Sequence, residues 1–500
     1  MSEDTGRIRR LLDPRARRVV FGDDAERAVR EELGFYLRVD RAHLVMLAER
    51  GLLSPAAAHL LLGVMDELSA TEGAALRGRP APRGLYLLYE GYLTERLGDE
   101  AGGALHLGRS RNDLNATVLR LRLRAHHDRL CREVLRLAAV LVHRAERHAG
   151  VVMPIYTHYQ AALPITYGHY LAGVAAALLR DARGLSDAAR EMESSPLGAG
   201  AAGGTTVPID PERTARLLGF ARTVPHSVDA VASRDLVLRV LAAAAVLGVT
   251  LSRLAADLQL WSTAEFDFVR FPDWLVGSSS MMPQKRNAFL LEHVRGRAGA
   301  PLGAFTAAVA AMQGTPFTNS IAVGTEGVSP LWRALDGMAE AALLARLCVA
   351  GAQPQPEAML RRAELGYTTA TELANHVVRE AGLSFRRAHY RVGEAVAAAA
   401  ESGEPLGAHA ALLLDELGMS GDGAAVSPAA VAAAAEYGGG PAPASFRRIV
   451  TGVRAEWAEL VGALRERRLR WAEGARDLDA AARSLVPAAA GPGAASHPPA

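Results

Sequence analysis

Residues 276–289, VGSSSMMPQKRNAF, concentrate side chains that can bind and react with a small anion. Ser279 brings a hydroxyl, Asn287 an amide, and Lys285, the one lysine of the chain, an ammonium group. Gly277 and the neighbouring serines permit a mobile loop that closes over a substrate and excludes water. The segment therefore predicts a reactive lid.

A second polar cluster occupies residues 106–117, HLGRSRNDLNAT. It places Arg109, Ser110, Arg111 and Asn112 at the start of a predicted long helix. A serine or asparagine at a helix start often acts only as a cap. The free N–H groups, the helix dipole and the guanidinium groups can equally hold a carboxylate. The residues alone leave both interpretations open.

A third cluster, YTHYQAALPITYGHY at residues 156–170, puts Thr157 and His158 ahead of another predicted helix. A lone histidine is usually structural, so His158 becomes a catalytic candidate only if a partner orients it. Two other chemistries fit poorly. No strand signals flank the Ser279 loop as a phosphate-binding loop requires, and no G-x-S-x-G elbow supports a serine hydrolase.

Long helices must position these three clusters. In residues 235–261 apolar side chains recur at steps of seven, and similar helical patterns cover about 112–148, 166–192, 288–312 and 330–350. Alternating strand-like sequence is nearly absent. We expect a mainly α protein whose long helices form a bundle and bury further faces against other subunits.

Changes in helix length and in Gly and Pro content predict three domains and a tail. Residues 1–109 form an N-terminal domain of shorter helices, and residues 110–360 form the central bundle. Residues 361–475 return to shorter helices in a C-terminal domain. Residues 476–500, rich in Pro, Ala and Gly, are expected to form a disordered tail.

Composition excludes several classes of partner. Lys and Arg number 56 against 54 Asp and Glu, a net charge of +2 that is too balanced for nucleic-acid binding. The N-terminal residues lack the apolar core of a signal peptide, and no uncharged apolar run is long enough to span a membrane. Cys131 and Cys348 lie in apolar helical sequence, which predicts buried free thiols. We expect a cytoplasmic protein.

At the three clusters the chain resembles the argininosuccinate lyases of the fumarase/aspartase superfamily. SSSMMPQKRN resembles the superfamily signature G-S-S-x-M-P-x-K-x-N, with Ser278 at the usual glycine. The segment HLGRSRNDL resembles H-T-G-R-S-R-N-D-Q, and IYTHYQAALP resembles G-Y-T-H-L-Q-R-A-Q-P. Further similarity covers nearly all of the chain up to about residue 420.

The resemblance implies a fold and a reaction. The expected protomer is mainly helical with three domains, and four copies form a homotetramer around a twenty-helix core, with each active site built from loops of three subunits. The expected reaction breaks a C–N or C–O bond β to a carboxylate and releases fumarate without a metal or cofactor. A base removes the Cβ proton, the adjacent carboxylate takes up charge, and the amine leaves.

The matching positions imply roles for individual residues. Ser279 matches the base, Lys285 binds the carboxylate that gathers charge, and His158 with Glu292 assists acid catalysis or orients a water. A serine hydroxyl is a poor base unless its alkoxide is stabilised, so helix-end N–H groups and Lys285 must help. The residues expected to contact the dicarboxylate are Arg109, Ser110, Arg111, Asn112, Thr157, Gln160, Ser280 and Asn287.

The chain departs from the family pattern where the leaving amine is expected. The family stretch S-T-Y-N-K-D-L-Q-E-D-K-E corresponds to FTNSIAVGTEGV at residues 317–328, so Asn319 replaces tyrosine and Ile321 replaces a basic residue. Tyr86 stands where the family has histidine. We expect Asn319, Ile321, Glu326 and Tyr86 to line the leaving-group pocket.

These departures predict a C–N lyase that releases fumarate and an amine or an amidine- or hydrazine-type product from an N-substituted aspartate, in a specialised, natural-product pathway. Each lost buried polar contact to the arginine half of the substrate would cost about 1–3 kcal/mol. An ordinary argininosuccinate lyase is the alternative. A non-catalytic protein like the structural lens crystallins is a remote one, because the residues of the reactive loop are retained.

Overall fold

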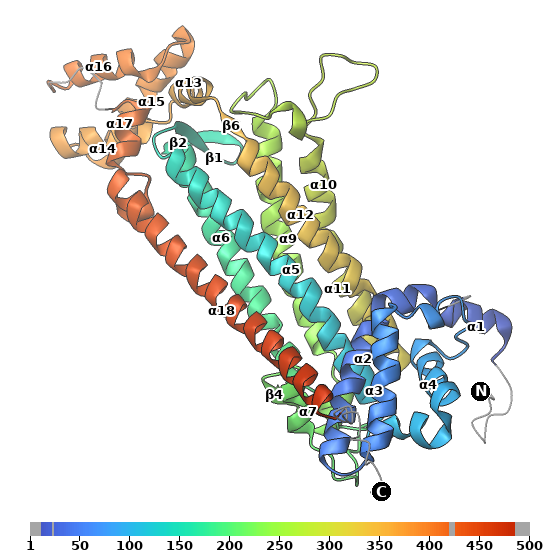
Figure 1. The fold of residues 1–500 in the computed structure, drawn as a ribbon. Helices are drawn as coiled ribbons and strands as arrows, with labels where there is room; N and C mark the ends of the chain where they lie inside the picture. Colours follow the sequence, from blue (N-terminus) through green and yellow to red (C-terminus); the bar gives the residue numbers. More distant parts are fainter. Residues whose placement is uncertain (1–11, 23–24, 420–425, 486–500) are drawn as a thin grey trace, which may run out of the picture.

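The computed structural model describes residues 12–22, 25–419 and 426–485. Its architecture is mainly α-helical, with a long central bundle between two smaller helical regions (Figure 1). The first region contains α1 (Pro14–Phe21), α2 (Glu26–Glu49), α3 (Pro55–Ala70) and α4 (Leu85–Gly102). The bundle contains α5 (Arg111–Arg147), α6 (Tyr167–Ala188), α9 (Asp235–Trp261), α10 (Phe289–Ala298), α11 (Ala300–Met312) and α12 (Ser329–Gly351).

The last region begins beyond the bundle. It contains α13 (Pro356–Leu365), α14 (Ala370–Ala381), α15 (Phe385–Ser402), α16 (Leu406–Glu416) and α17 (Pro428–Ala434), and it ends in α18 (Pro443–Ser484). Two short helices, α7 (Pro211–Leu217) and α8 (Ser227–Ala232), lie in the connection between α6 and α9.

Three two-stranded sheets complete the described fold. The largest is the antiparallel hairpin of β1 (Val152–Thr157) and β2 (Gln160–Thr166). A parallel pair joins β3 (Ser194–Ser195) to β4 (Arg222–Thr223), and an antiparallel pair joins β5 (Val269–Arg270) to β6 (Gln353–Pro354).

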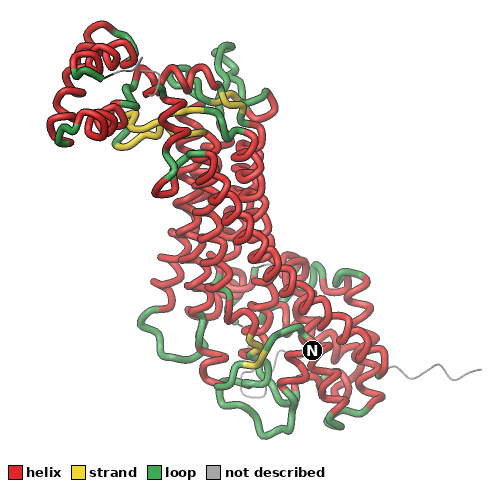
Figure 2. The backbone as a smooth tube through the Cα atoms, turned by 90° about the vertical axis from the view of Figure 1, so that its left-hand side faces the viewer, coloured by secondary structure: helices red, strands yellow, loops and turns green. Residues whose placement is uncertain are grey.

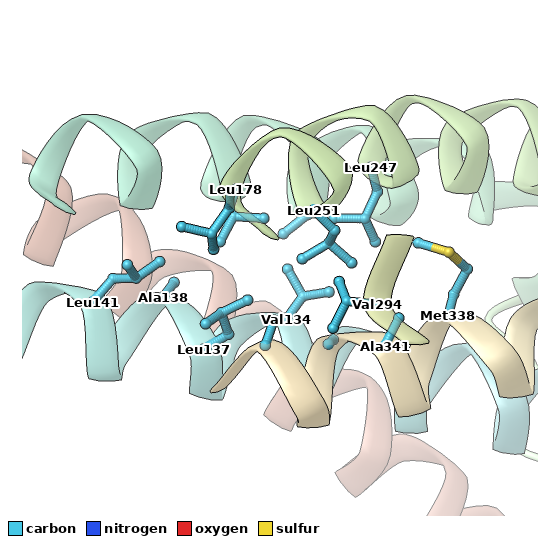
Figure 3. Packing of buried hydrophobic residues seen from close by; sticks show 14 of the residues in the cluster. Val134, Leu137, Ala138, Leu141, Leu178, Leu247, Leu251, Val294, Met338 and Ala341 are labelled. Carbon is cyan, nitrogen blue, oxygen red and sulfur yellow. The ribbon is translucent and has the colours of Figure 1, made fainter. Parts of the chain in front are cut away.

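Apolar spacing explains the bundle core. Along α9, Val240, Leu247, Leu251 and Leu254 are buried, as the repeat of seven predicts. Figure 3 shows Leu247 and Leu251 packed among side chains of α5, α6 and α12, including Val134. The prediction of a helix at 235–261 is confirmed to the residue.

The predicted helix at 288–312 is interrupted. The chain forms α10 and α11 instead, with the break at Gly299 just before Pro301. Proline lacks a backbone N–H group and clashes with the preceding turn, so it starts a new helix rather than continuing one.

The β1–β2 hairpin was not expected from the sequence. Two prolines weaken the strand signal, yet Pro154 and Pro164 face each other in the register, in strands that need no further neighbour. The turn consists of His158 and Tyr159, whose φ angles are 51° and 62°. Two consecutive positive φ values are typical of a type I′ turn, where Asn-Gly is the usual sequence.

The prediction for residues 361–500 is wrong in one respect. Residues 476–484 belong to α18, a helix of 42 residues, rather than to a disordered tail or a set of shorter helices. α18 runs along α5 and α6 and reaches the N-terminal region, where Leu478 and Ala482 are buried. This burial holds its last turns in place, although the local composition is rich in Ala and charged residues. Residues 486–500 lie outside the described part.

The core also bears on the predictions about the cysteines and about membrane-spanning segments. Cys131 and Cys348 are free and buried, as predicted. Among the described residues, α9 is long and apolar enough to cross a membrane by length and composition. It packs against α6, α10, α11 and α12 within the bundle.

The bundle has two distinct ends, with the β1–β2 hairpin and β6 near one end and the N-terminal region, together with β4, near the other (Figure 1 and Figure 2). We call them the hairpin end and the N-terminal end. α5 connects them with 37 residues. At about 1.5 Å of rise per residue, it separates them by roughly 55 Å.

Candidate active site

The polar cluster at the N-terminal end is held by Asp113. Ser110 caps α5 and forms a capping box with Asp113, whose Oδ1 accepts a hydrogen bond from the Ser110 N–H group at 2.9 Å. Its Oδ2 accepts from the N–H groups of Gly198 and Gly200, at 2.9 and 3.0 Å. Burial raises the pKa of Asp113, although these N–H groups act in the opposite direction. Sequence reasoning did not assign this residue, which ties the glycine-rich segment at 198–204 to the start of α5.

Two predictions are corrected here: Arg109 as a contact of the dicarboxylate and Tyr86 as part of the leaving-group pocket. Arg109 donates to Asp40 at 2.5 Å and to the Tyr86 hydroxyl at 2.5 Å, and the side chains of both Arg109 and Asp40 are fully buried. Tyr86 is buried too, between the rings of Tyr36 and Tyr89. A buried guanidinium needs a carboxylate partner, and Asp40 is that partner for Arg109. Arg109 and Tyr86 are therefore engaged inside the protein and do not face a substrate. Both side chains support, from the protein interior, the segment that leads into α5.

Other residues of this cluster remain accessible. Arg111 is exposed and Asn112 is half-buried in the first turn of α5. The free N–H groups of that turn and the nearby cation still suit a carboxylate, so the cap and the anion site coexist here.

The segment predicted to hold the leaving amine lies beside this cluster. The Asn319 Nδ2 group donates to Asn112 Oδ1 at 3.0 Å. Phe317 and Ile321, on either side of Asn319, are 70% and 69% exposed, and Glu326 is also exposed. Residues 322–326 form a π-helical turn, which is rare and concentrated at functional sites. Phe317 was not named as a candidate from sequence.

The Ser279 loop is pinned at its base. Gly277 and Asn287 exchange two backbone hydrogen bonds, of 2.9 and 2.8 Å. Arg286 donates to Asp273 at 2.6 Å and anchors one arm of the loop. Between these anchors Ser280 and Lys285 are exposed.

The hydroxyl of Ser279 sits where negative charge is stabilised. Its Oγ accepts from the backbone N–H groups of Met281 and Met282, at 3.3 and 3.1 Å. Those two donors suit an alkoxide better than a neutral hydroxyl. The sequence predicts that helix-end N–H groups assist Ser279. In the structure the nearby N–H groups belong to a tight turn instead.

The hairpin carries the third cluster at its tip. Thr157, His158 and Gln160 are exposed there. The ring of Tyr156 packs on Phe266 and Phe268, with centroids 5.7 and 6.4 Å apart, which places the hairpin at the same end as the chain leading into the Ser279 loop. His158 and Tyr159 have a left-handed backbone conformation although neither is glycine. Such conformations are strained and occur often at functional sites.

The predicted partner of His158 has another contact within this chain. Glu292 is exposed in the first turn of α10 and accepts a hydrogen bond from Gln259 Nε2 at 3.3 Å. The His158–Glu292 pair remains a prediction.

The three clusters do not meet within one chain. The Asn112 cluster and the 317–328 segment lie at the N-terminal end, while the Ser279 loop and the His158 turn lie at the hairpin end (Figure 1). α5 alone separates Asn112 from the hairpin by roughly 55 Å, far beyond the reach of any loop described here. Within the described residues of one chain, the predicted clusters therefore lie at opposite ends of the bundle.

Comparisons with known proteins identify the family of the chain. The family described as "Lyase" matches residues 45–303, and "Argininosuccinate lyase C-terminal" matches residues 367–426. The argininosuccinate lyase of Azotobacter vinelandii is 38% identical over 421 residues, which are 83% of this chain and 89% of the relative. That of Methanoculleus marisnigri is 38% identical over 413 residues, which are 81% and 84% of the two chains.

Solved structures show the same fold. EDDS lyase in complex with formate superposes with a TM-score of 0.83 at 30% identity, over 92% of both chains. An EDDS lyase variant with bound fumarate gives 0.82, also at 30% identity and 92% of both chains. Class II fumarase from Schistosoma mansoni, at 16% identity and a TM-score of 0.67 over 82% of this chain and 91% of its own, shares the fold.

Proposed function

Because this chain belongs to the argininosuccinate lyase family of the fumarase/aspartase superfamily and is a fumarate-releasing carbon–nitrogen lyase, we propose that its substrate is an N-substituted aspartate whose leaving amine is less polar than arginine. The product amine then belongs to a specialised, natural-product pathway in the cytoplasm.

This proposal depends on the low polarity of the 317–328 segment, which contacts Asn112. Where argininosuccinate lyases place polar and charged residues, this chain presents Phe317 and Ile321, both mostly exposed in the single chain and adjacent to the Asn319–Asn112 contact. Apolar side chains leave a guanidinium without hydrogen-bond partners, which is costly in a closed site. They favour a leaving group with apolar surface.

The proposed reaction uses the Ser279 loop. Ser279 takes the proton from Cβ while Met281 and Met282 N–H groups stabilise its oxygen. Lys285 and Asn287 bind the carboxylate that gathers charge, and Ser280, Thr157 and Gln160 complete the polar contacts. The C–N bond to the amine then breaks and fumarate remains. His158, oriented by Glu292 from another copy, orients a water or assists as an acid.

A homotetramer supplies the missing proximity. Apolar side chains are exposed on the outside of the bundle: Val246 and Val249 of α9 are each 59% exposed, and Leu302 of α11 is also exposed. Apolar patches on long parallel helices are suited to burial against further copies of the same helices. Such packing brings the N-terminal end of one copy to the hairpin end of another.

An ordinary argininosuccinate lyase is the second candidate. The observation in its favour is the 38% identity to two argininosuccinate lyases over most of the chain. It requires the arginine half of the substrate to be held by residues other than those of the 317–328 segment.

A substrate panel separates the two. The purified enzyme is offered argininosuccinate and a series of aspartates N-substituted with alkyl, aryl and amidine groups, and the rise in fumarate absorbance gives kcat/KM. We expect an apolar N-substituent to exceed argininosuccinate by about 10-fold or more. Preference for argininosuccinate would establish the ordinary enzyme, and no fumarate from any member would refute elimination.

A double variant tests whether the 317–328 segment determines the preference for the leaving amine. Combining N319Y with I321K restores the side chains typical of argininosuccinate lyases, and it should shift the preference toward argininosuccinate. T318S in the same segment serves as the control, because Thr318 is exposed and keeps its hydroxyl. An unchanged preference in the double variant would show that the amine is held elsewhere.

A further inference from the structure

We propose that Asn319 is a positioning residue that fixes the amide orientation of Asn112, so that Asn112 presents its NH₂ group, and not its carbonyl oxygen, to a carboxylate of the substrate. This inference rests on the proposed function only in placing a dicarboxylate at Asn112. It changes the role of Asn319 from a contact of the leaving amine to a support of the fumarate grip.

The contact itself sets the orientation. Asn319 Nδ2 donates to Asn112 Oδ1 at 3.0 Å, across 207 residues of sequence. The two ends of an asparagine side chain have nearly the same shape, so hydrogen bonds decide which end points where. With Oδ1 of Asn112 occupied as an acceptor, its two N–H groups point away from Asn319. They are then available to an anion at the start of α5, where the backbone N–H groups also favour negative charge.

The 317–328 segment is constructed to hold Asn319 at this place. Ser320, the next residue, accepts from the Gly324 N–H group at 2.8 Å through its carbonyl and from the Val323 N–H group at 3.3 Å through its hydroxyl. Val323 is buried and anchors the π-helical turn. The position of Asn319 therefore follows from a folded turn and not from a free loop.

Gly324 makes room for the Asn319 side chain. A Cβ atom at Gly324 would lie 3.0 Å from Asn319 Oδ1, tighter than nine in ten real Cβ contacts. The small residue at 324 therefore lets the Asn319 side chain lie against the turn and reach Asn112.

The decisive variant is N319D. It keeps the size of the side chain but removes the donor, so the new carboxylate accepts from the Asn112 NH₂ group and turns the carbonyl of Asn112 toward the substrate. Fumarate binding to the intact enzyme is measured by calorimetry. We expect the Kd to rise by about 10-fold or more, the effect of losing a charge-assisted hydrogen bond and facing a carbonyl instead.

N115D is the matched control for charge alone. Asn115 lies three residues further along α5, on the same side of the helix, and its Oδ1 accepts from the Tyr36 hydroxyl at 3.0 Å. A carboxylate there keeps that hydrogen bond and adds the same charge near the site. We expect a change in Kd of no more than about 2-fold.

A mutant cycle with N112A isolates the coupling. In the N112A background, N319D should weaken fumarate binding no more than N115D does, because no amide remains to be turned. Size-exclusion chromatography and melting temperatures confirm that each variant is assembled and folded.

Several results would overturn the inference: equal effects of N319D and N115D, an undiminished effect of N319D in N112A, or no fumarate binding by the wild-type enzyme. The proposed function fails separately. A wild-type enzyme that binds fumarate but cleaves no N-substituted aspartate would refute that function while the cycle on fumarate binding still decides the role of Asn319.

Discussion

At Ser279, two backbone N–H groups decide whether a hydroxyl can serve as a base. An isolated serine is far too weak an acid to lose its proton at neutral pH, so the protein must stabilise the alkoxide. Met281 and Met282 direct their N–H groups at Oγ in the chain without a substrate, so these two donors are already in place. The same logic of preset donors applies at Asn112, where another side chain fixes which end is offered.

S279A should abolish most catalysis without disturbing the fold. Removing the base is expected to lower kcat by about 10²-fold to 10⁴-fold, while the melting temperature and the oligomeric mass stay unchanged, since the loop is held by Gly277, Asn287 and Arg286. The control is S278A, because Ser278 is exposed and occupies the usual glycine position. An S279A enzyme that retained most of its turnover would place the base elsewhere.

His127 should make the enzyme sensitive to acid. Burial lowers its pKa from 6.5 to about 4, while its Nε2 bonds to the Leu185 carbonyl. The unfolded chain binds a proton near pH 6.5 that the folded chain does not bind until about pH 4, so stability is full above pH 6.5 and falls as the pH drops toward 4. At about 1.4 kcal/mol per pH unit, the loss reaches roughly 2 kcal/mol at pH 5.

The check is the decline in melting temperature between pH 7 and pH 5. H127Q keeps a donor for Leu185 and has no titrating group, so this decline should be smaller than in the wild type. H59Q, at the exposed His59 of α3, should leave it unchanged. Equal slopes in all three proteins would show that other groups control the acid response.

At the scale of elements, α18 acts as a brace along the bundle. The buried Glu193 carboxylate accepts from Trp471 Nε1 at 3.2 Å and pairs with Arg470 at 3.3 Å. Beside this contact the backbones of α18 and residue 219 approach each other closely. Both positions are glycine, Gly474 in α18 and Gly219 opposite it. The brace connects the hairpin end to the N-terminal end independently of α5.

G474A should loosen this brace. A Cβ atom at Gly474 would lie 2.4 Å from the backbone nitrogen of Gly219, so the helix must shift. We expect a loss of about 1–3 kcal/mol in the free energy of unfolding. G452A, in the same helix but with nothing within 4 Å, should instead add up to about 1 kcal/mol. Denaturant unfolding of both variants measures the contrast, and equal effects would contradict the close packing.

The elements differ in how far the sequence determines them. α9 follows from apolar spacing, because it buries one stripe along its whole length. The hairpin and the end of α18 depend on tertiary contacts. The prolines of the hairpin disfavour strands locally, and Leu478 and Ala482 are buried in a cluster formed largely by the N-terminal region. Likewise the motif positions of Ser279 and Asn112 could be predicted, but the burial of Arg109 behind Asp40, 69 residues away, could not.

At the scale of the molecule, the separation of the clusters shapes the enzyme. One end of a chain carries Ser279, the proposed base, and the other carries Asn112, the proposed carboxylate contact, with α5 between them. In the proposed homotetramer every chain therefore contributes to more than one site, and each site depends on more than one chain.

Two inactive variants should restore each other. When S279A and N112A are co-expressed and assemble at random, about a quarter of the sites receive an intact loop from one copy and an intact cluster from another. We expect a corresponding recovery of turnover, measured against each variant alone. A mixture of S279A with K285A should recover nothing, because both changes lie in one loop. Failure of the first mixture would contradict shared sites.

The length of α5 also has an evolutionary consequence. After duplication of the gene, one copy can lose the residues of its hairpin end and the other those of its N-terminal end, while mixed assemblies keep working sites. Each gene then becomes essential to the other although neither encodes a whole catalyst. A helix that keeps two halves of a site apart thus provides a direct route from a single enzyme to an obligate pair of genes.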